Sequence, residues 1–519
     1  MRVLADRFAA GFGRSPVARA GVAVSLGGVT VLLALSPAVA GASPGTVSAA
    51  ATSAAGGSVT GGPATGGPAT GGPASGPAAT GPSVAGQAAA APAPPSNAEC
   101  VRKFVRVTYP KTGFAACYTP LQLQRAYGLR RLYARGFDGR GRTIVVADPF
   151  GSPTIRHDLA VFDRAFHLPA PPSFRILQPA GPVPPFNAGD ALMRDKAGET
   201  TLDVEVAHAM APGAGIALIE TPGLTSTNVA SGGGYPQLMA AENYVIEHNL
   251  GDVITQSFSL PEQNFPPGDI QRLRYAYVDA FRHHVTVLAA SNDNGVTGPN
   301  PAGTAYYQHR VVEWPASDPL VTGVGGIKLF LDAAGRGILP DTAWNDTYTL
   351  ATPTPWASNG GLSRIFGRPS YQNPVRRIVG GHRGVPDISL SAALTAGVLI
   401  YASYPGNGFP FNGWTPGGGT SEATPEFAGI VAVADQFAGR RLGLVNPALY
   451  RLAQAHAPGI VDIARGGNTV SFVQGARFLT VKGFRASRGY DLVTGAGTVN
   501  AARLVPELAG PAAASEPGR

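Results

Sequence analysis

One glycine-rich segment delivers a serine to the start of a predicted helix. The residues Gly417-Gly418-Gly419-Thr420-Ser421 precede a helical stretch that continues through Ile430. The first turn of a helix has free backbone N–H groups, which can stabilise the oxyanion formed when a serine attacks a carbonyl. Ser421 is therefore a candidate nucleophile. The alternative is that this serine is an ordinary helix N-cap.

Two carboxylates share one face of another predicted helix. Within residues 198–208, Glu199 and Asp203 are four positions apart and therefore project from the same side. Two carboxylates at this spacing repel each other unless they share a proton, which raises the pKa of one of them. A functional acid pair is one interpretation, and a solvated helix face is the other.

A third polar segment directly follows a predicted buried strand. Ala290-Ser291-Asn292-Asp293-Asn294-Gly295 comes after the apolar run at 285–289. Ligands collect at the carboxyl ends of parallel strands, which makes Asp293 a candidate site residue. The alternative is a simple Asx turn.

These three segments belong to an alternation of strands and helices. Apolar runs rich in β-branched residues predict buried strands at 143–147, 215–219, 253–255 and 285–289. Helical patterns are found around 158–166, 239–247 and 270–283. This alternation predicts an α/β domain with a parallel sheet.

Composition divides the 519-residue chain into a low-complexity part and a folded part. Most of the excess of its 69 Gly and 47 Pro precedes residue 97, and we expect a single domain over 97–510 and a disordered tail over 511–519. The net charge of +8 comes from basic residues scattered along the chain. Because nucleic-acid-binding surfaces need clustered basic residues, we predict no nucleic-acid partner.

The first 40 residues have the pattern of an export signal. Arginines precede an apolar run at 20–35, and Pro37-Ala38-Val39-Ala40 predicts cleavage after Ala40. An uncleaved membrane anchor is the alternative, although the run is short for one. We expect a secreted, extracellular protein with no stable membrane association after cleavage. Residues 41–96 consist mainly of Ala, Gly, Pro, Ser and Thr, which predicts a disordered linker.

The chain has only two cysteines, Cys100 and Cys117. They form no CxxC motif and no Cys/His spacing, which excludes zinc and iron–sulfur sites. In an oxidising compartment they predict a disulfide that contributes about 3 kcal/mol to stability. Two unrelated buried thiols are the alternative.

Together the polar segments resemble the sedolisin, or serine-carboxyl, peptidases of the subtilase-like superfamily, in a secreted bacterial branch. The resemblance rests on Glu199-x-x-x-Asp203, Asp293 and Gly419-Thr420-Ser421, and it covers roughly 117–508. It implies a subtilisin-like three-layer α/β domain whose central, mainly parallel sheet is flanked by helices. Other matching segments, in the order of the family, are Trp314-Pro315-Ala316-Ser317, Val324-Gly325-Gly326, Gly360-Gly361-Leu362-Ser363, Pro369-Ser370-Tyr371-Gln372, Arg383-Gly384-Val385-Pro386-Asp387 and Gly489-Tyr490-Asp491-Leu492-Val493-Thr494-Gly495.

The resemblance also implies a role for each candidate residue. Ser421 matches the nucleophile, Glu199 the general base, Asp203 the carboxylate that orients the base, and Asp293 the residue that assists at the oxyanion. A glutamate accepts a proton only when ionised, whereas Asp293 donates a hydrogen bond only when protonated. We therefore expect an endopeptidase that acts on proteins or peptides in acid through an acyl-enzyme, as a monomer.

A structural calcium ion near the C-terminus is a further implication of the resemblance. The matching ligands are the side chains of Asp462 and Asp491 and the backbone carbonyls of Ile463, Ser487 and Gly489. A set of ligands made only of oxygen atoms suits Ca²⁺.

The chain departs from the family in three places. Phe258-Ser259 replaces a common Trp-Gly that borders the active site, Asp148 stands where some members have glutamate, and low-complexity sequence lies where a prodomain is usual. The alternative function is a catalytically impaired, secreted peptide-binding protein of the same fold. A subtilisin-type enzyme is excluded because no histidine is followed by Gly-Thr.

Overall fold

The computed structural model describes residues 92–225 and 227–510. The predicted signal peptide (1–40), the 41–91 part of the predicted linker and the predicted tail (511–519) lie outside the described residues. In the described part of the chain, no helix is long and apolar enough to cross a membrane. The first element is α1 (Asn97–Cys100), which is capped by the side chain of Ser96.

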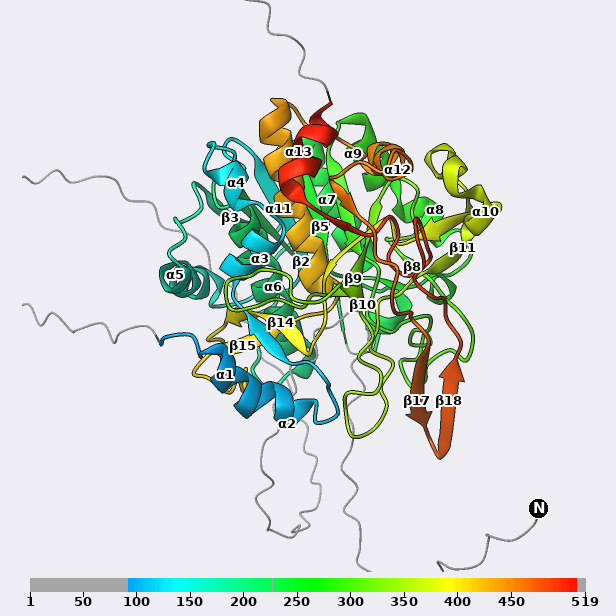
Figure 1. Cartoon of the computed structure of the whole chain (residues 1–519), viewed down its shortest axis with the longest axis horizontal. Coiled ribbons are helices and arrows are strands. Elements are labelled where there is room, and N and C mark those ends of the chain that lie inside the picture. The colour runs from blue at the N-terminus through cyan, green and yellow to red at the C-terminus, as the bar shows by residue number, and fades with distance from the viewer. Residues whose placement is uncertain (1–91, 226, 511–519) are drawn as a thin grey trace, which may run out of the picture. The chain divides into compact units, whose positions relative to one another are not determined.

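An eight-stranded sheet lies at the centre of the domain (Figure 1). Its pairings are all parallel except the one at its β10 edge. The strand order is β10 (Thr342–Ala343), β9 (Thr322–Lys328), β7 (Thr286–Ala290), β5 (Val253–Gln256), β2 (Thr143–Pro149), β4 (Gly215–Thr221) and β3 (Phe174–Leu177), with β13 (Ile388–Ser391) paired to β9.

Helices cover both faces of this sheet. They are α6 (Ala191–Met210) and α11 (Thr420–Ala438) on one face, and α7 (Tyr235–Glu247) and α9 (Tyr275–Arg282) on the other. Successive residues of a strand point to opposite faces. Accordingly, Ile144 and Val146 of β2 join the apolar core with α6 and α11, whereas Val145 and Ala147 join the core with α7 and α9. The expected three-layer α/β architecture is confirmed.

Smaller elements complete the described part of the chain, and several of their strands pair outside the central sheet. The helical ones are η1 (Val101–Val105), α2 (Arg106–Thr108), α3 (Pro120–Ala126), α4 (Arg130–Tyr133), η2 (Val229–Ser231), η3 (Glu262–Asn264), η4 (Ser370–Val375), α10 (Arg376–Val379), α12 (Asn446–Gln454) and α13 (Ala501–Ala509). The strands are β1 (Ala116–Tyr118), β6 (Leu260–Pro261), β8 (Glu313–Trp314), β11 (Gly361–Gly367), β12 (His382–Val385), β14 (Ala396–Tyr401), β15 (Trp414–Gly417), β16 (Ile460–Val461), β17 (Val470–Gln474), β18 (Arg477–Val481) and β19 (Thr498–Val499).

The elements predicted from the sequence are present, with one difference. The four predicted strands correspond to β2, β4, β5 and β7, and two predicted helices correspond to α5 (Ile155–Phe166) and α7. The third predicted helix is divided at Arg274 into α8 (Asp269–Leu273) and α9. The guanidinium of Arg274 donates two hydrogen bonds to Asp318, of 2.8 and 2.7 Å, which hold the junction to a distant segment.

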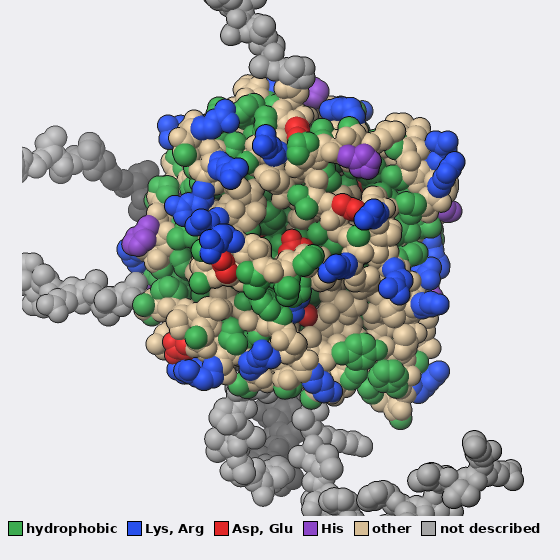
Figure 2. All heavy atoms as spheres, in the orientation of Figure 1, with side chains coloured by type: hydrophobic (Ala, Val, Ile, Leu, Met, Phe, Trp, Pro, Cys, Tyr) green, Lys and Arg blue, Asp and Glu red, His purple; other side chains and the backbone are tan. Residues whose placement is uncertain are grey.

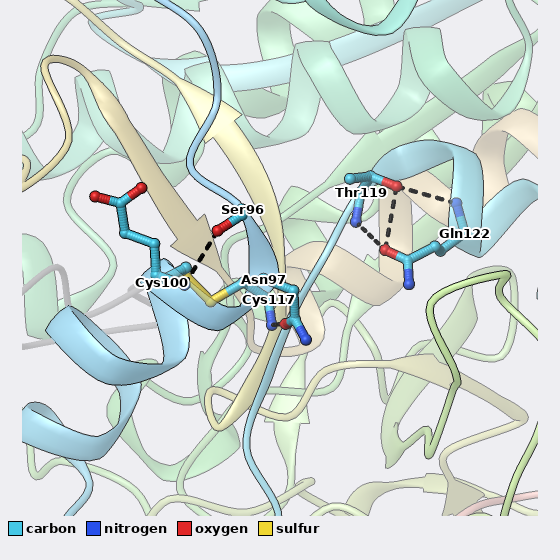
Figure 3. Close-up of a disulfide and its surroundings, with 7 residues drawn as sticks. Ser96, Asn97, Cys100, Cys117, Thr119 and Gln122 are labelled. Atoms are coloured by element: carbon cyan, nitrogen blue, oxygen red, sulfur yellow. Dashed lines mark hydrogen bonds between the residues drawn. A yellow bond between two sulfur atoms is a disulfide. The ribbon is translucent and has the colours of Figure 1, made fainter.

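The predicted disulfide is present between Cys100 and Cys117 (Figure 3). It joins the end of α1 to β1, with the two Cα atoms 6.2 Å apart. The side chain of Asn97 accepts a hydrogen bond of 2.8 Å from the backbone N–H of Cys117 beside it. The N-terminal helix is therefore fixed to the edge of the β1-β14-β15 sheet.

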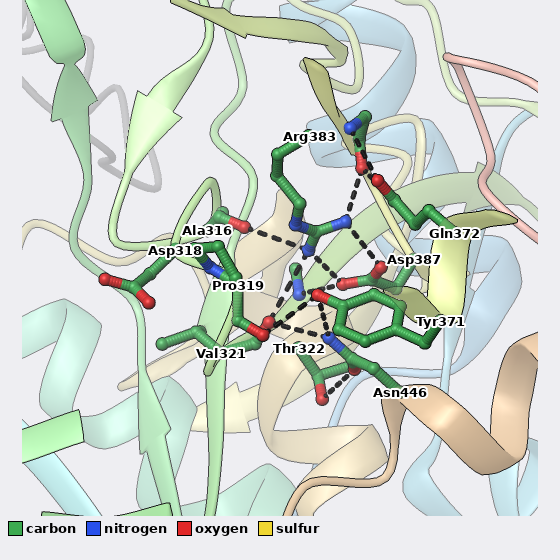
Figure 4. A network of polar contacts seen from close by, with 12 residues as sticks. Ala316, Asp318, Pro319, Val321, Thr322, Tyr371, Gln372, Arg383, Asp387 and Asn446 are labelled. Carbon is green, nitrogen blue, oxygen red and sulfur yellow. Dashed lines mark hydrogen bonds and ion pairs between the residues drawn. The ribbon is translucent and has the colours of Figure 1, made fainter. Parts of the chain in front are cut away.

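Three of the segments that carry the family resemblance meet at one buried ion pair (Figure 4). Arg383 and Asp387 are both fully buried, and their side chains are joined by a bond of 2.7 Å and a second, shorter one. The guanidinium also donates to the backbone carbonyl of Ala316 at 3.4 Å, and Gln372 exchanges two hydrogen bonds with the residue after Arg383. These segments therefore have a structural role, because a buried charge must keep its partner.

Candidate active site

Glu199 and Asp203 lie one turn apart in the middle of α6, inside the protein. Their exposed fractions are 1% and 0%, which excludes the interpretation as a solvated helix face. The helix approaches the loop before α11 closely, since a side chain at Gly417 would meet Leu202 at 2.7 Å. The absence of a side chain at Gly417 thus allows α6 to pack closely against the segment that leads into α11.

Asp203 belongs to a cluster of buried carboxyl groups. Ser257, just after β5, donates a hydrogen bond of 2.9 Å to Asp203 Oδ1. Burial raises the pKa of Asp203 well above its usual value, and the nearby Asp148 and Glu199 raise it further. Burial likewise raises the pKa of Asp148, which lies near the end of β2, and Glu199 adds to the effect. These carboxyl groups favour a state in which some of them keep their protons.

Lys196 is a site residue that the sequence analysis missed. It lies one turn before Glu199 on α6 and is only 4% exposed. Burial lowers its pKa, but the surrounding carboxylates of Asp195, Glu199 and Asp148 together raise it above the usual value. Its Nζ lies 3.6 Å from Asp195 Oδ2. A buried positive charge therefore stands beside the acid cluster.

Ser421 is the second residue of α11, and its exposed fraction is 1%. The residue at the N-cap position is Gly419, which has no side chain with which to cap the helix. The interpretation of Ser421 as an ordinary N-cap is therefore wrong. Gly419 has φ +84°, a left-handed conformation that favours glycine, and a side chain there would collide with Asp293.

The carboxyl of Asp293 contacts the residue before Ser421. Asp293 Oδ1 accepts hydrogen bonds from Thr420 N, at 2.7 Å, and from Thr420 Oγ1, at 2.8 Å. Burial raises the pKa of Asp293 to about 7, the bonds from Thr420 lower it, and the nearby Glu199 raises it. Asp293 thus contacts the residue before Ser421 and lies near enough to Glu199 for the two charges to interact, as Asp203 does with Glu199. The raised pKa of Asp293 favours its protonated form in acid.

Asn292 makes the turn that places Asp293, and Glu313 holds Asn292. Asn292 has φ +89°, and its side-chain oxygen accepts bonds from the backbone N–H groups of Asp293 and Asn294. Its amide nitrogen donates to the buried Glu313, which also accepts a bond of 2.9 Å from Ser259 Oγ. Sequence analysis missed Glu313, and it gave no reason for the Phe258-Ser259 that replaces the common Trp-Gly of the family. The structure gives the hydroxyl of Ser259 a role, because it donates a hydrogen bond to Glu313.

Comparisons with known proteins find similar chains over about three quarters of this one. Kumamolisin from Bacillus sp. (strain MN-32) is 31% identical over 410 residues, which are 77% of this chain and 65% of kumamolisin. The solved structure of Pseudomonas sedolisin, a serine-carboxyl proteinase complexed with two molecules of pseudo-iodotyrostatin, matches with a TM-score of 0.62 and 26% identity, over 76% of this chain and 98% of that one. The chain belongs to the sedolisin family.

Two further relatives are similar to about half of this chain. Sedolisin from Pseudomonas sp. (strain 101) is 30% identical over 53% of this chain, and human tripeptidyl-peptidase 1 is 30% identical over 51% of it. The matched regions are 43% and 44% of those two relatives. The chain thus spans from under half to about two thirds of the curated relatives that it matches. No family model matches it.

The segments predicted to bind calcium lie together in this sedolisin-family fold. Asp462 Oδ2 accepts a hydrogen bond of 3.2 Å from Gly489 N, and Asp491 Oδ2 accepts one of 2.8 Å from Ser487 N. Neither carboxylate forms an ion pair with a basic side chain of the described residues. In the same described part, no group of three or more His, Cys, Asp or Glu side chains could hold a metal ion. Such a group consists of side chains alone, whereas the predicted site combines two carboxylates with the backbone carbonyl oxygens of Ile463, Ser487 and Gly489. A set of ligands made of oxygen atoms is the kind that Ca²⁺ prefers.

Proposed function

We propose that this chain is a secreted serine-carboxyl endopeptidase that hydrolyses peptide bonds of proteins in acid. The observation that carries the proposal is the contact of Asp293 with Thr420, next to Ser421, at the start of a helix that packs against α6, the helix of Glu199 and Asp203. The peptidase relatives support the reaction class. Secretion rests on the signal pattern in residues 1–40.

In the proposed mechanism, Ser421 Oγ attacks the carbonyl carbon of the scissile bond while Glu199 takes the proton of the hydroxyl. Asp203 orients Glu199, and the neutral carboxyl of Asp293 donates a hydrogen bond to the oxyanion. Glu199 then returns its proton to the leaving amine, which leaves an acyl ester on Ser421. The same base activates a water molecule that hydrolyses this ester.

The protonation states that the mechanism needs have a physical cause. Glu199 must be ionised although it is buried among other carboxyl groups, and the positive charge of Lys196 favours its ionised form. Asp203 and Asp148 have raised pKa values and hold their protons more readily. A single negative charge in the cluster can therefore be compensated by Lys196.

Hydrolysis of acid-denatured haemoglobin tests the proposed activity. We expect internal fragments, identified by mass spectrometry, to form rapidly near pH 4 and much more slowly at pH 8, because Asp293 must keep its proton. A chain that binds peptides at every pH but cleaves none would support the alternative, a catalytically impaired peptide-binding protein.

We also propose that Asp462, Asp491 and the carbonyls of Ile463, Ser487 and Gly489 bind one structural Ca²⁺ ion. The carboxylates have no basic partner among the described side chains, and each is hydrogen-bonded to the segment that would supply two of the carbonyls. A divalent cation would stabilise the approach of residues 487–491 to residue 462. Its role here is structural, and no step of catalysis involves it.

Chelation is expected to lower the melting temperature of the protein. A ligand present at 100 times its dissociation constant stabilises the native state by about 2.7 kcal/mol, which chelation removes. Thermal unfolding with EDTA, and with EDTA followed by excess CaCl₂, measures the loss and its recovery. Asp462→Asn should abolish the response, whereas Asp332→Asn, at an acid of another surface loop, should keep it. An unchanged melting curve and no calcium by elemental analysis would contradict the site.

A further inference from the structure

A cavity of about 1010 Å³ opens between α3, α4, the loop at 329–341 and the segment at 461–465. None of the predicted catalytic residues lines it. Figure 2 shows basic side chains gathered on this face of the molecule, over the region where Figure 1 places α3 and α4. The volume is in the range of sites that bind small molecules.

Four arginines whose guanidinium groups have no hydrogen-bond or ion-pair partner among the described residues line this cavity, which we call the arginine cavity. Arg125 comes from α3, Arg130 and Arg131 from α4, and Arg465 from the segment after β16. Among the described residues, none of these four guanidinium groups forms a hydrogen bond or an ion pair, and all four side chains are exposed. Guanidinium groups stay charged at any pH at which proteins are folded. The cavity therefore carries fixed positive charge.

The acids at the cavity do not neutralise this charge. Asp341 and Asp462 are the two carboxylates that line it, against the four unpartnered guanidinium groups. A fifth arginine, Arg336, is already paired with Asp332 at 2.9 Å, on the loop that closes one side. An anion of more than one charge is therefore the complementary ligand.

The wall of the arginine cavity also offers an unused polar group and apolar surface. Thr498 is buried, and its hydroxyl has no hydrogen-bond partner among the described residues. Leu339 and Val461 are 56% and 41% exposed there. A buried hydroxyl without a partner is costly unless a ligand or water satisfies it. These features suit an organic anion more than a bare inorganic ion.

We propose that the arginine cavity binds a ligand that carries two or more phosphate groups. The planar guanidinium group donates paired hydrogen bonds to phosphate, and the four groups come from three separate segments, which suits several phosphates. The choice of phosphate over carboxylate rests on the proposed function. In acid, Asp and Glu side chains lose their charge, whereas a phosphate group keeps one.

Binding of inorganic tripolyphosphate to the full-length Ser421→Ala chain tests the proposal. Calorimetric titration at pH 5 and at pH 7 in 0.15 M salt is expected to give one saturable site. The double variant R130Q/R131Q should weaken binding at least tenfold. The matched control R376Q/R377Q changes two adjacent, exposed arginines of the short helix α10 and should leave binding unchanged. Melting curves of both variants verify that they fold.

Three outcomes would overturn the proposal. They are the absence of saturable binding, an equal loss in both double variants, and tighter binding of a poly-glutamate peptide than of tripolyphosphate at pH 5, which would indicate a site for acidic peptides. Asp462 and Ile463, which we propose as calcium ligands, also line the cavity, so the titration is repeated on a chain that also carries Asp462→Asn. The tenfold difference between the two double variants should persist there. Because the titrated chain lacks Ser421, the result is independent of whether the proposed peptidase activity exists.

Discussion

Replacing Ser421 with alanine is expected to lower kcat for peptide hydrolysis by about 10⁵-fold or more, the scale of loss when the nucleophile of a serine triad is removed. Without the hydroxyl, no acyl-enzyme can form, and Glu199 and Asp293 are left to assist only the direct attack of water on the peptide bond. The change removes one oxygen atom from a buried residue in the first turn of α11. Alanine is a good helix former, so the fold should be kept.

A quenched fluorescent peptide measures this loss, with Ser370→Ala as the control. Ser370 is an exposed serine of η4, and its variant should keep the wild-type rate. A peptide aldehyde should add covalently to wild type and to Ser370→Ala, but not to Ser421→Ala, as intact-mass spectrometry would show. A Ser421→Ala rate within a few-fold of wild type, with no contaminating peptidase, would rule out this nucleophile.

The layered fold follows from local sequence patterns. The apolar runs of β2, β4, β5 and β7 are each buried on both faces, so a continuous apolar pattern was sufficient to predict them. The break at Arg274 could not be predicted in this way, because residues 269–283 contain no glycine or proline. The break coincides with the bond of Arg274 to Asp318, 44 residues later in the chain.

The candidate site was predictable only in part, for a physical reason. The family resemblance identifies the four predicted catalytic residues by their sequence motifs, which are Glu199, Asp203, Asp293 and Ser421. It does not identify Lys196. A lysine three residues before a glutamate usually makes an exposed ion pair on a helix surface, so nothing in the sequence marked this one as buried. Its importance comes from the burial of α6 from Lys196 to Met210, which results from packing against α11 and other elements around it.

The arginine cavity depends on even longer-range contacts. Its four unpartnered arginines are scattered basic residues in the sequence, and scatter was the argument against a charged binding surface. The structure brings Arg465 beside the segment that holds Arg125, Arg130 and Arg131, more than 300 positions earlier. The prediction that no nucleic acid binds remains a prediction.

Buried carboxyl groups outside the site make stability depend on pH over the same range as activity. Burial raises the pKa of both Glu422 and Asp435, on α11, to about 8. Such a group binds its proton more tightly in the folded chain than in the unfolded one. Its contribution to stability is therefore complete below about pH 4 and is lost as the pH rises through about 8. Any loss of activity toward neutral pH must be separated from unfolding.

The pH profiles of Glu199→Gln and Asp293→Asn are expected to differ in kind. Glu199→Gln has no base and should lose about 10⁴-fold in rate at every pH. Wild type should lose activity as the pH rises through about 7, because Asp293 then ionises and can no longer donate to the oxyanion. Asp293→Asn keeps a donor that does not titrate, so its rate should be lower but level across this range.

Lys196→Met should move the acid limb of the pH profile to higher pH, since Glu199 loses the positive charge that favours its ionised form.

These profiles distinguish a carboxylate base from a histidine base. An imidazole base gains activity as the pH rises through about 6.5, which is the opposite direction. The near-ultraviolet circular dichroism of each sample should be recorded at the assay pH, because a native spectrum at a pH where activity is lost shows that the loss comes from titration of the site and not from unfolding. Full activity at pH 8 would refute the mechanism, because Asp293 could not then be a neutral donor. A Glu199→Gln rate close to that of wild type would refute it too, because Glu199 could not then be the base. Either result would rule out this mechanism even if the chain proved to be a peptidase.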